Sequence, residues 1–120
     1  MNNKPKYTLF KNASYALSGL RHAVKTEVSF KIELAIAVVF FPLVYFLPFE
    51  LTYKLILVVS YVLIMVTELL NSAIENVVDL VTHEIHPLAK AAKDIASTAV
   101  FFTVLLHLLC WGVIGLDYLK

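Results

Sequence analysis

The residues whose types and spacing could carry chemistry lie in one short segment in the middle of the chain. Glu68, Asn71, Glu75 and Asp79 follow thirteen uncharged residues, 55–67. At about 3.6 residues per turn, separations of seven and eleven residues bring these side chains to one side of a helix. With a rise of about 1.5 Å per residue, Glu68 lies about 10 Å deeper along the axis than Glu75. Ionisable groups within a membrane span are costly, so this polar stripe predicts a functional site.

The chemistry that this stripe favours is the binding of Mg²⁺ and a phosphate. Mg²⁺ usually takes one or two protein carboxylates, with phosphate oxygens and water completing its shell. Lys93 is suited to neutralising a polyphosphate, and Glu68 to accepting the proton of a hydroxyl held at headgroup depth. There is no Gly-x-x-x-x-Gly-Lys-Ser/Thr loop, so a nucleotide would be bound without the usual phosphate cradle. The residues alone leave open a membrane enzyme, a transporter and a purely structural set of helix-pairing charges.

The elements that must position these residues follow from a composition suited to a lipid bilayer. The 120 residues form one expected domain, 1–120, with 60% apolar and 16% charged residues, which is too apolar for a small soluble fold. A net charge of +1 without a concentrated basic face argues against nucleic-acid binding. The single cysteine, Cys110, excludes a disulfide framework and provides no Cys/His zinc spacing. The lysine-bearing N-terminus does not resemble a cleaved signal peptide.

The apolar pattern predicts an all-α membrane protein with four helices. Residues 7–26 form an amphipathic helix that is too charged to span, so it is expected to lie in the headgroup plane, with packing on its own bundle as the alternative. Three transmembrane helices are expected at 29–48, 51–81 and 90–117. Pro42 is expected to kink the first of them.

Two further expectations concern orientation and the middle of the bundle. Eight of the ten Lys and Arg residues flank the N-terminus or the turn between the second and third spans, which predicts that this side faces the cytoplasm. His107 lies within an apolar run and is expected to be a hydrogen-bonded interior residue. Trp111 and Tyr118 are expected to form an aromatic belt at the opposite side.

Two segments resemble the signature of the small prokaryotic diacylglycerol kinase family: residues 68–79, ELLNSAIENVVD, and residues 89–97, AKAAKDIAS. Residues 15–21, YALSGLR, and 27–33, EVSFKIE, also match, so the resemblance covers nearly the whole chain. It implies a homotrimer in the bacterial inner membrane, with composite active sites between protomers. It also implies Mg²⁺ as cofactor and transfer of the γ-phosphate of ATP to a membrane lipid alcohol.

The same resemblance assigns roles to individual positions. Glu68 matches the catalytic base, and Glu27 and Glu75 match metal-bridged nucleotide ligands. One departure is Thr8, because the family commonly has an arginine there; Lys6 or Lys11 is the candidate replacement. The nucleotide-binding positions implied are Tyr15, Glu27, Asn71, Glu75, Asp79, Glu84, His86, Lys93 and Asp94. The lipid-substrate positions implied are Ala13, Ser14, Arg21, Phe30, Lys31, Glu33, Glu68, Ser97 and Trp111.

The resemblance leaves two lipid substrates open, because the family has a diacylglycerol and an undecaprenol branch. Glu33 resembles the diacylglycerol branch, where the other branch usually has histidine, whereas residues 86–94 resemble the undecaprenol branch. Glu33 is expected beside the lipid headgroup, so diacylglycerol is the favoured substrate and undecaprenol the alternative. A small proton-coupled transporter ranks below both.

Overall fold

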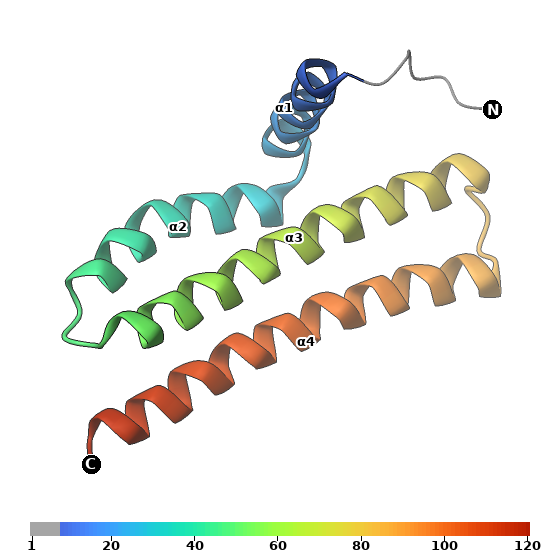
Figure 1. Ribbon diagram of the computed structural model, residues 1–120. Coiled ribbons are helices and arrows are strands. Elements are labelled where there is room, and N and C mark those ends of the chain that lie inside the picture. Colours follow the sequence, from blue (N-terminus) through green and yellow to red (C-terminus); the bar gives the residue numbers. More distant parts are fainter. Residues whose placement is uncertain (1–7) are drawn as a thin grey trace.

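The computed structural model describes residues 8–120, and this part of the chain is helical throughout apart from short connections (Figure 1). Its helices are α1 (Leu9–Thr26), α2 (Val28–Phe46), α3 (Leu51–Val81) and α4 (Pro87–Tyr118). The helices α2, α3 and α4 are each long and apolar enough to cross a membrane. The all-helical class and the three candidate membrane spans are therefore confirmed. Residue 7, where the first helix was expected to begin, and Lys6 lie outside the described residues.

The long helices lie side by side, and α3 is the central one. It runs antiparallel to α4 along nearly its whole length, while the shorter α2 packs against its first half (Figure 1). In the view of Figure 1, α1 is seen nearly end-on where α2 begins, so it leaves the plane of the other three helices. The second half of α3, which carries the polar stripe, therefore extends past α2 toward α1 and the α3–α4 turn.

The break between α1 and α2 is a single residue, Glu27. Its backbone is extended, with φ −103° and ψ 105°, and its N–H donates to the carbonyl of Ala23 at 2.8 Å. At the other end of α1, Thr8 is the N-cap, and its Oγ1 accepts a hydrogen bond from the Lys11 N–H at 3.2 Å. A threonine in this position stabilises a helix start, so Thr8 has a structural role where the family resemblance expects arginine.

Two helix boundaries differ from the sequence expectation for local reasons. Helix α4 begins at Pro87, three residues before the expected 90, because His86 caps it: the His86 Nδ1 accepts from the Leu88 N–H at 3.1 Å. Proline in the first turn needs no hydrogen-bond partner for its nitrogen. Helix α2 ends at Phe46, since the residue before Pro48 takes an extended conformation. Pro42 lies inside α2, which continues past it as one helix.

The middle of the bundle holds a hydrogen-bonded polar group among aromatic rings. His107 is buried, its Nδ1 lies 2.7 Å from the Ser60 Oγ of α3, and its Nε2 accepts from the Trp111 Nε1–H at 3.0 Å. The Phe40 ring from α2 lies 5.5 Å from the His107 ring. The expectation that His107 is a hydrogen-bonded interior residue is confirmed, and both of its ring nitrogens have partners, as a polar group at membrane depth requires.

The end of the bundle opposite the α3–α4 turn is closed by aromatic and charged side chains. The Phe49 ring lies 5.1 Å from that of Tyr118 and 6.4 Å from that of Trp111. The Tyr53 hydroxyl donates to the Asp117 carboxylate, which joins α3 to the last turn of α4. Trp111 and Tyr118 thus share one end of the bundle, where the sequence expects the aromatic belt.

Leu57 in α3 is 0% exposed, so replacing it tests how tightly the helices pack in the middle of the bundle. Burial between helices in lipid stabilises mainly through van der Waals contact, because acyl chains are themselves apolar. We expect Leu57→Ala to lower the free energy of unfolding by about 2 kcal/mol through the cavity that it leaves. Leu109→Ala, on the exposed face of α4, is the matched control and should change it by less than about 0.5 kcal/mol. Equal effects of the two variants in mixed-micelle unfolding titrations would contradict this packing.

Candidate active site

The polar stripe on α3 lies on one side of that helix, as the spacing predicts. The Asn71 Nδ2 donates to the Glu75 Oε1 at 3.0 Å, one turn further along, and both residues are half-buried. The Asn71 Oδ1 is buried and makes no hydrogen bond. An oxygen without a donor beside a carboxylate is suited to a cation or to a hydrogen-bond donor on a ligand.

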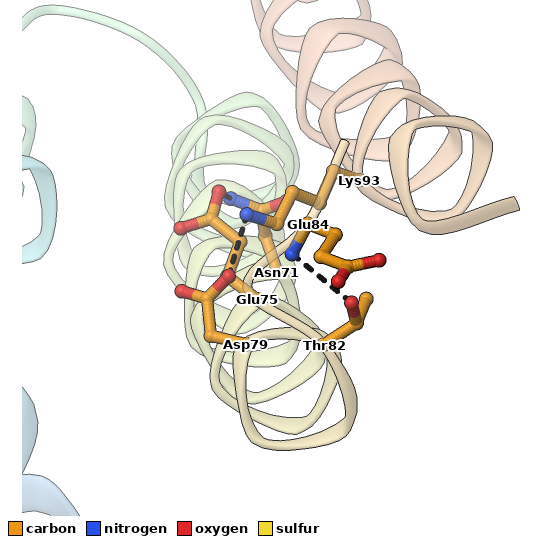
Figure 2. A network of polar contacts seen from close by, with 6 residues as sticks. All are labelled: Asn71, Glu75, Asp79, Thr82, Glu84 and Lys93. Carbon is orange, nitrogen blue, oxygen red and sulfur yellow. Dashed lines mark hydrogen bonds and ion pairs between the residues drawn. The ribbon is translucent and has the colours of Figure 1, made fainter. Parts of the chain in front are cut away.

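A lysine from α4 reaches across to this stripe. The Lys93 Nζ lies 2.7 Å from the Asp79 Oδ1, and Figure 2 shows the lysine beside both Asp79 and Glu75. The two side chains of the ion pair are 42% and 55% exposed, so solvent or a ligand can reach them. Asp94, the next residue, pairs instead with Lys90 on its own helix at 2.5 Å. The antiparallel packing of α3 and α4 therefore places one cation among the carboxylates.

Further into the bundle, carboxylates from α2 and α3 meet. The carboxyl groups of Glu33 and Glu68 lie close enough to interact directly, and the second oxygen of Glu33, Oε2, is buried without a hydrogen-bond partner. Glu27 and Glu75 also lie within electrostatic reach of Glu68. Four acidic residues that are up to 48 positions apart in the sequence are thus gathered around one face of α3.

The carboxylates and the free amide oxygen are of the chemical type that Mg²⁺ accepts as ligands. Within residues 8–120, no three His, Cys, Asp or Glu side chains are arranged to hold a metal ion by themselves. A protein site with one or two carboxylates is what Mg²⁺ uses when phosphate oxygens and water supply the remaining ligands. Glu75, with the unpaired Asn71 Oδ1 one turn away, is suited to that mode of binding, and Glu27 lies within electrostatic reach of the neighbouring Glu68.

Two hollows adjoin the acidic residues. The first, of about 440 Å³, lies at the α3–α4 turn, and its polar lining includes Asp79, His83, Lys93 and Asp94. Glu84 also lines it, but this residue turns its carboxylate away from Glu75 and Asp79 and donates its backbone N–H to Thr82 Oγ1 at 3.0 Å (Figure 2). The second hollow, of about 420 Å³, lies between α1 and α3, and Glu27 is one of its polar lining residues. Its other lining residues are mainly small or apolar and include Ala16, Gly19, Leu20, Leu69, Ser72 and Ala73.

Several expected site residues are not brought together with the acidic cluster in this single chain. Trp111 lies eighteen residues beyond Lys93 on α4, about 27 Å along the axis, and packs with His107. Within this chain it therefore lies toward the opposite end of the bundle, and its role at the lipid substrate stays a prediction. Phe30 is 2% exposed and packs inside the chain. The others lie on exposed faces of α1, α2 and α4: Ala13, Ser14, Tyr15, Arg21, Lys31 and Ser97.

Tyr61 contacts the segment that carries Glu33, although the sequence pattern did not single it out as a site residue. Its hydroxyl donates to the Glu33 carbonyl at 2.5 Å, linking α3 to the helix that carries Glu33. The signal was present, because Tyr61 precedes Glu68 by seven residues and so lies on the same face of α3. Because Tyr61 lies in an uncharged run, its sequence context predicts only a packing role.

The fold and the site define an all-helical membrane protein with three helices long and apolar enough to cross a bilayer and a carboxylate-rich site toward one end. The family model described as prokaryotic diacylglycerol kinase matches residues 14–115. The chain therefore belongs to the prokaryotic diacylglycerol kinase family and is an enzyme of the kinase class.

Three relatives, each named diacylglycerol kinase, show how far the similarity extends. The protein of Haemophilus influenzae is 41% identical over 105 residues, which cover 87% of this chain and 88% of that protein. The protein of Escherichia coli K12 is 33% identical over 114 residues, 94% of this chain and 93% of its own length. The protein of Pseudomonas aeruginosa is 35% identical over 100 residues, 83% and 81% respectively.

The Lys93–Asp79 pair is partly exposed, so we expect it to contribute little to the free energy of unfolding. Exposed ion pairs contribute about 0.2–1 kcal/mol, so a double-mutant cycle of Lys93→Met and Asp79→Asn should give a coupling energy below about 1 kcal/mol. The coupling, measured from unfolding in mixed micelles, should weaken as salt is added. A coupling of 2 kcal/mol or more would mean that the pair is a structural link between α3 and α4.

Proposed function

We propose that this protein transfers the γ-phosphate of ATP to the hydroxyl of diacylglycerol, giving phosphatidic acid and ADP, with Mg²⁺ as cofactor. The observation that carries the proposal is the order of the site along α3. Asp79, Glu75 and the Lys93 cation lie toward the α3–α4 turn, and Glu68 with Glu33 lies deeper in the bundle. A water-soluble phosphate donor and a lipid hydroxyl need this order to meet at the membrane boundary.

The outer part of the site is suited to the nucleotide. The hollow at the α3–α4 turn is lined by Lys93, whose ammonium group is accessible to phosphate oxygens, and by His83 and His86. Glu27 and Glu75 are the residues that would hold Mg²⁺ together with the phosphates, with Asn71 fixing the Glu75 carboxylate. Bound Mg²⁺ would neutralise charge on the phosphate groups during transfer. By the same resemblance, Tyr15, Asp79, Glu84 and Asp94 are proposed to lie around the nucleotide.

The inner part of the site is suited to the lipid alcohol. Glu68 accepts the proton of the hydroxyl, whose oxygen forms the new bond to the γ-phosphorus as the bond to the β-phosphate oxygen breaks and ADP leaves. Glu33 lies against Glu68 and is the residue proposed to contact the diacylglycerol headgroup. The mainly apolar hollow between α1 and α3, with Glu27 among its lining residues, provides a path for an acyl chain.

The membrane location extends the same proposal. Helix α1 buries only Ala23 against the rest of the chain and exposes Leu9, Phe10 and Leu17, which is typical of a helix lying on a membrane surface. The distribution of basic residues favours an orientation with the N-terminus and the site on the cytoplasmic side. The family resemblance supports the bacterial inner membrane as the location. From the family resemblance we further propose a homotrimer with composite sites, in which the exposed Arg21 and Ser97 would face a partner or the substrate.

The test of this function is a direct assay on the purified full chain in mixed lipid and detergent micelles with Mg²⁺ and ATP. Diacylglycerol and undecaprenol are supplied side by side, and phosphorylated lipid is measured. We expect phosphatidic acid to form at least about tenfold faster, because Glu33 lies beside Glu68 where a headgroup would be held. Faster phosphorylation of undecaprenol would assign the other lipid. ATP-independent, proton-driven efflux from vesicles without lipid phosphorylation would support a transporter instead.

A second prediction concerns the proton acceptor. Glu68→Gln keeps the size of the side chain and removes its ability to take a proton, so kcat should fall at least about 100-fold while binding of Mg²⁺ and ATP, measured by calorimetry, stays within about twofold. Glu50→Gln removes a carboxylate at the opposite end of the bundle and is the matched control, expected to keep full turnover. Turnover retained by Glu68→Gln would remove Glu68 from the role of base.

A further inference from the structure

Helix α2 is joined to α3 by side-chain hydrogen bonds at two levels. Near the far end, the Lys54 Nζ donates to the Tyr45 carbonyl at 2.6 Å. Near the site, the Tyr61 hydroxyl donates to the Glu33 carbonyl at 2.5 Å. The second bond ends on the backbone of the residue whose carboxyl group meets Glu68, so Tyr61 acts on the placement of Glu33 directly.

The Tyr61 hydroxyl is aimed by rings that hold its own ring in place. Tyr61 is 7% exposed, and the centroids of Phe40, Phe41 and His107 lie 4.9, 5.8 and 5.6 Å from its ring. His107 is fixed in turn by its bonds to Ser60 and Trp111. A ring packed on three neighbours loses little further freedom when its hydroxyl forms a hydrogen bond, which makes the bond directional and specific.

The bond uses a free acceptor site of the Glu33 carbonyl. In an α-helix, a carbonyl oxygen accepts from the N–H four residues later, and its second lone pair remains available. When that lone pair is taken by a residue of α3, both the height and the rotation of α2 against α3 are set at this point. Tyr61 lies two turns before Glu68 on the same face of α3, so the bond relates the backbone of Glu33 to the helix that carries Glu68.

We propose that Tyr61 is a positioning residue that holds the Glu33 carboxyl against Glu68 and so shapes the site for the lipid alcohol. This inference rests on the proposed kinase function. The hydroxyl does not touch the substrate; it fixes the segment of α2 that does. Loss of the hydroxyl should therefore weaken the use of diacylglycerol and leave the nucleotide side unchanged.

The test compares the full chain with Tyr61→Phe, which keeps the ring and its packing and removes the hydroxyl. In mixed micelles, the KM for diacylglycerol at saturating Mg²⁺ and ATP should rise about fivefold, the size expected for one hydrogen bond. The KM for ATP should stay within about twofold. A merely structural role would lower stability and the active fraction, hence kcat, and would leave both KM values unchanged.

Tyr53→Phe is the matched control, because it removes a tyrosine hydroxyl of the same helix that bonds Asp117 of α4 at the opposite end of the bundle. It should lower the melting temperature without changing the KM for diacylglycerol. If Tyr61→Phe does not fold, Tyr61→Met removes the hydroxyl with a flexible side chain that fills the space. An unchanged KM for diacylglycerol in an active Tyr61 variant overturns the positioning role alone, whereas absence of lipid phosphorylation by the unaltered protein overturns the kinase function on which it rests.

Discussion

The constraint on which the rest of this structure depends is that the carboxylates of α3 cannot face acyl chains. Their desolvation in lipid is costly, so they must meet other protein groups, water or a ligand. Antiparallel packing of α3 on α4 places Lys93 beside Asp79, and packing of α2 on α3 places Glu33 beside Glu68. The contact between Glu33 and Glu68 brings two acids together, an arrangement that favours a site over a purely structural pairing of charges.

The two ends of the bundle satisfy their polar groups in different ways. In the middle of the bundle, Ser60 and Trp111 each form a hydrogen bond with His107, and at the far end Tyr53 bonds Asp117. Toward the site end, buried oxygens of Glu33 and Asn71 remain without partners. A buried polar atom without a hydrogen bond is destabilising, so these two oxygens lower the stability of the folded chain at the end where a ligand is expected to bind. The paired groups in the rest of the bundle carry no such cost.

The short connections are as important as the helices. Glu27 is the only residue between α1 and α2, so the carboxylate proposed to hold Mg²⁺ lies at the corner between these two helices. His86 caps α4 at the same time as it lines the hollow at the α3–α4 turn. Both residues thus have a backbone position that the ends of the helices fix, which lowers the entropic cost of using them in a site.

The sequence by itself determined the class of fold, the helix that carries the site and the side of that helix on which Glu68, Asn71, Glu75 and Asp79 lie, because hydropathy and a 3.6-residue repeat are local properties. The family signature supplied the expected roles. Only the tertiary structure decided that Glu33 meets Glu68, that the Tyr61 hydroxyl bonds the Glu33 carbonyl and that Ser60 meets His107. These contacts join different helices, and their existence depends on the height and rotation at which the helices pack, which no local pattern encodes.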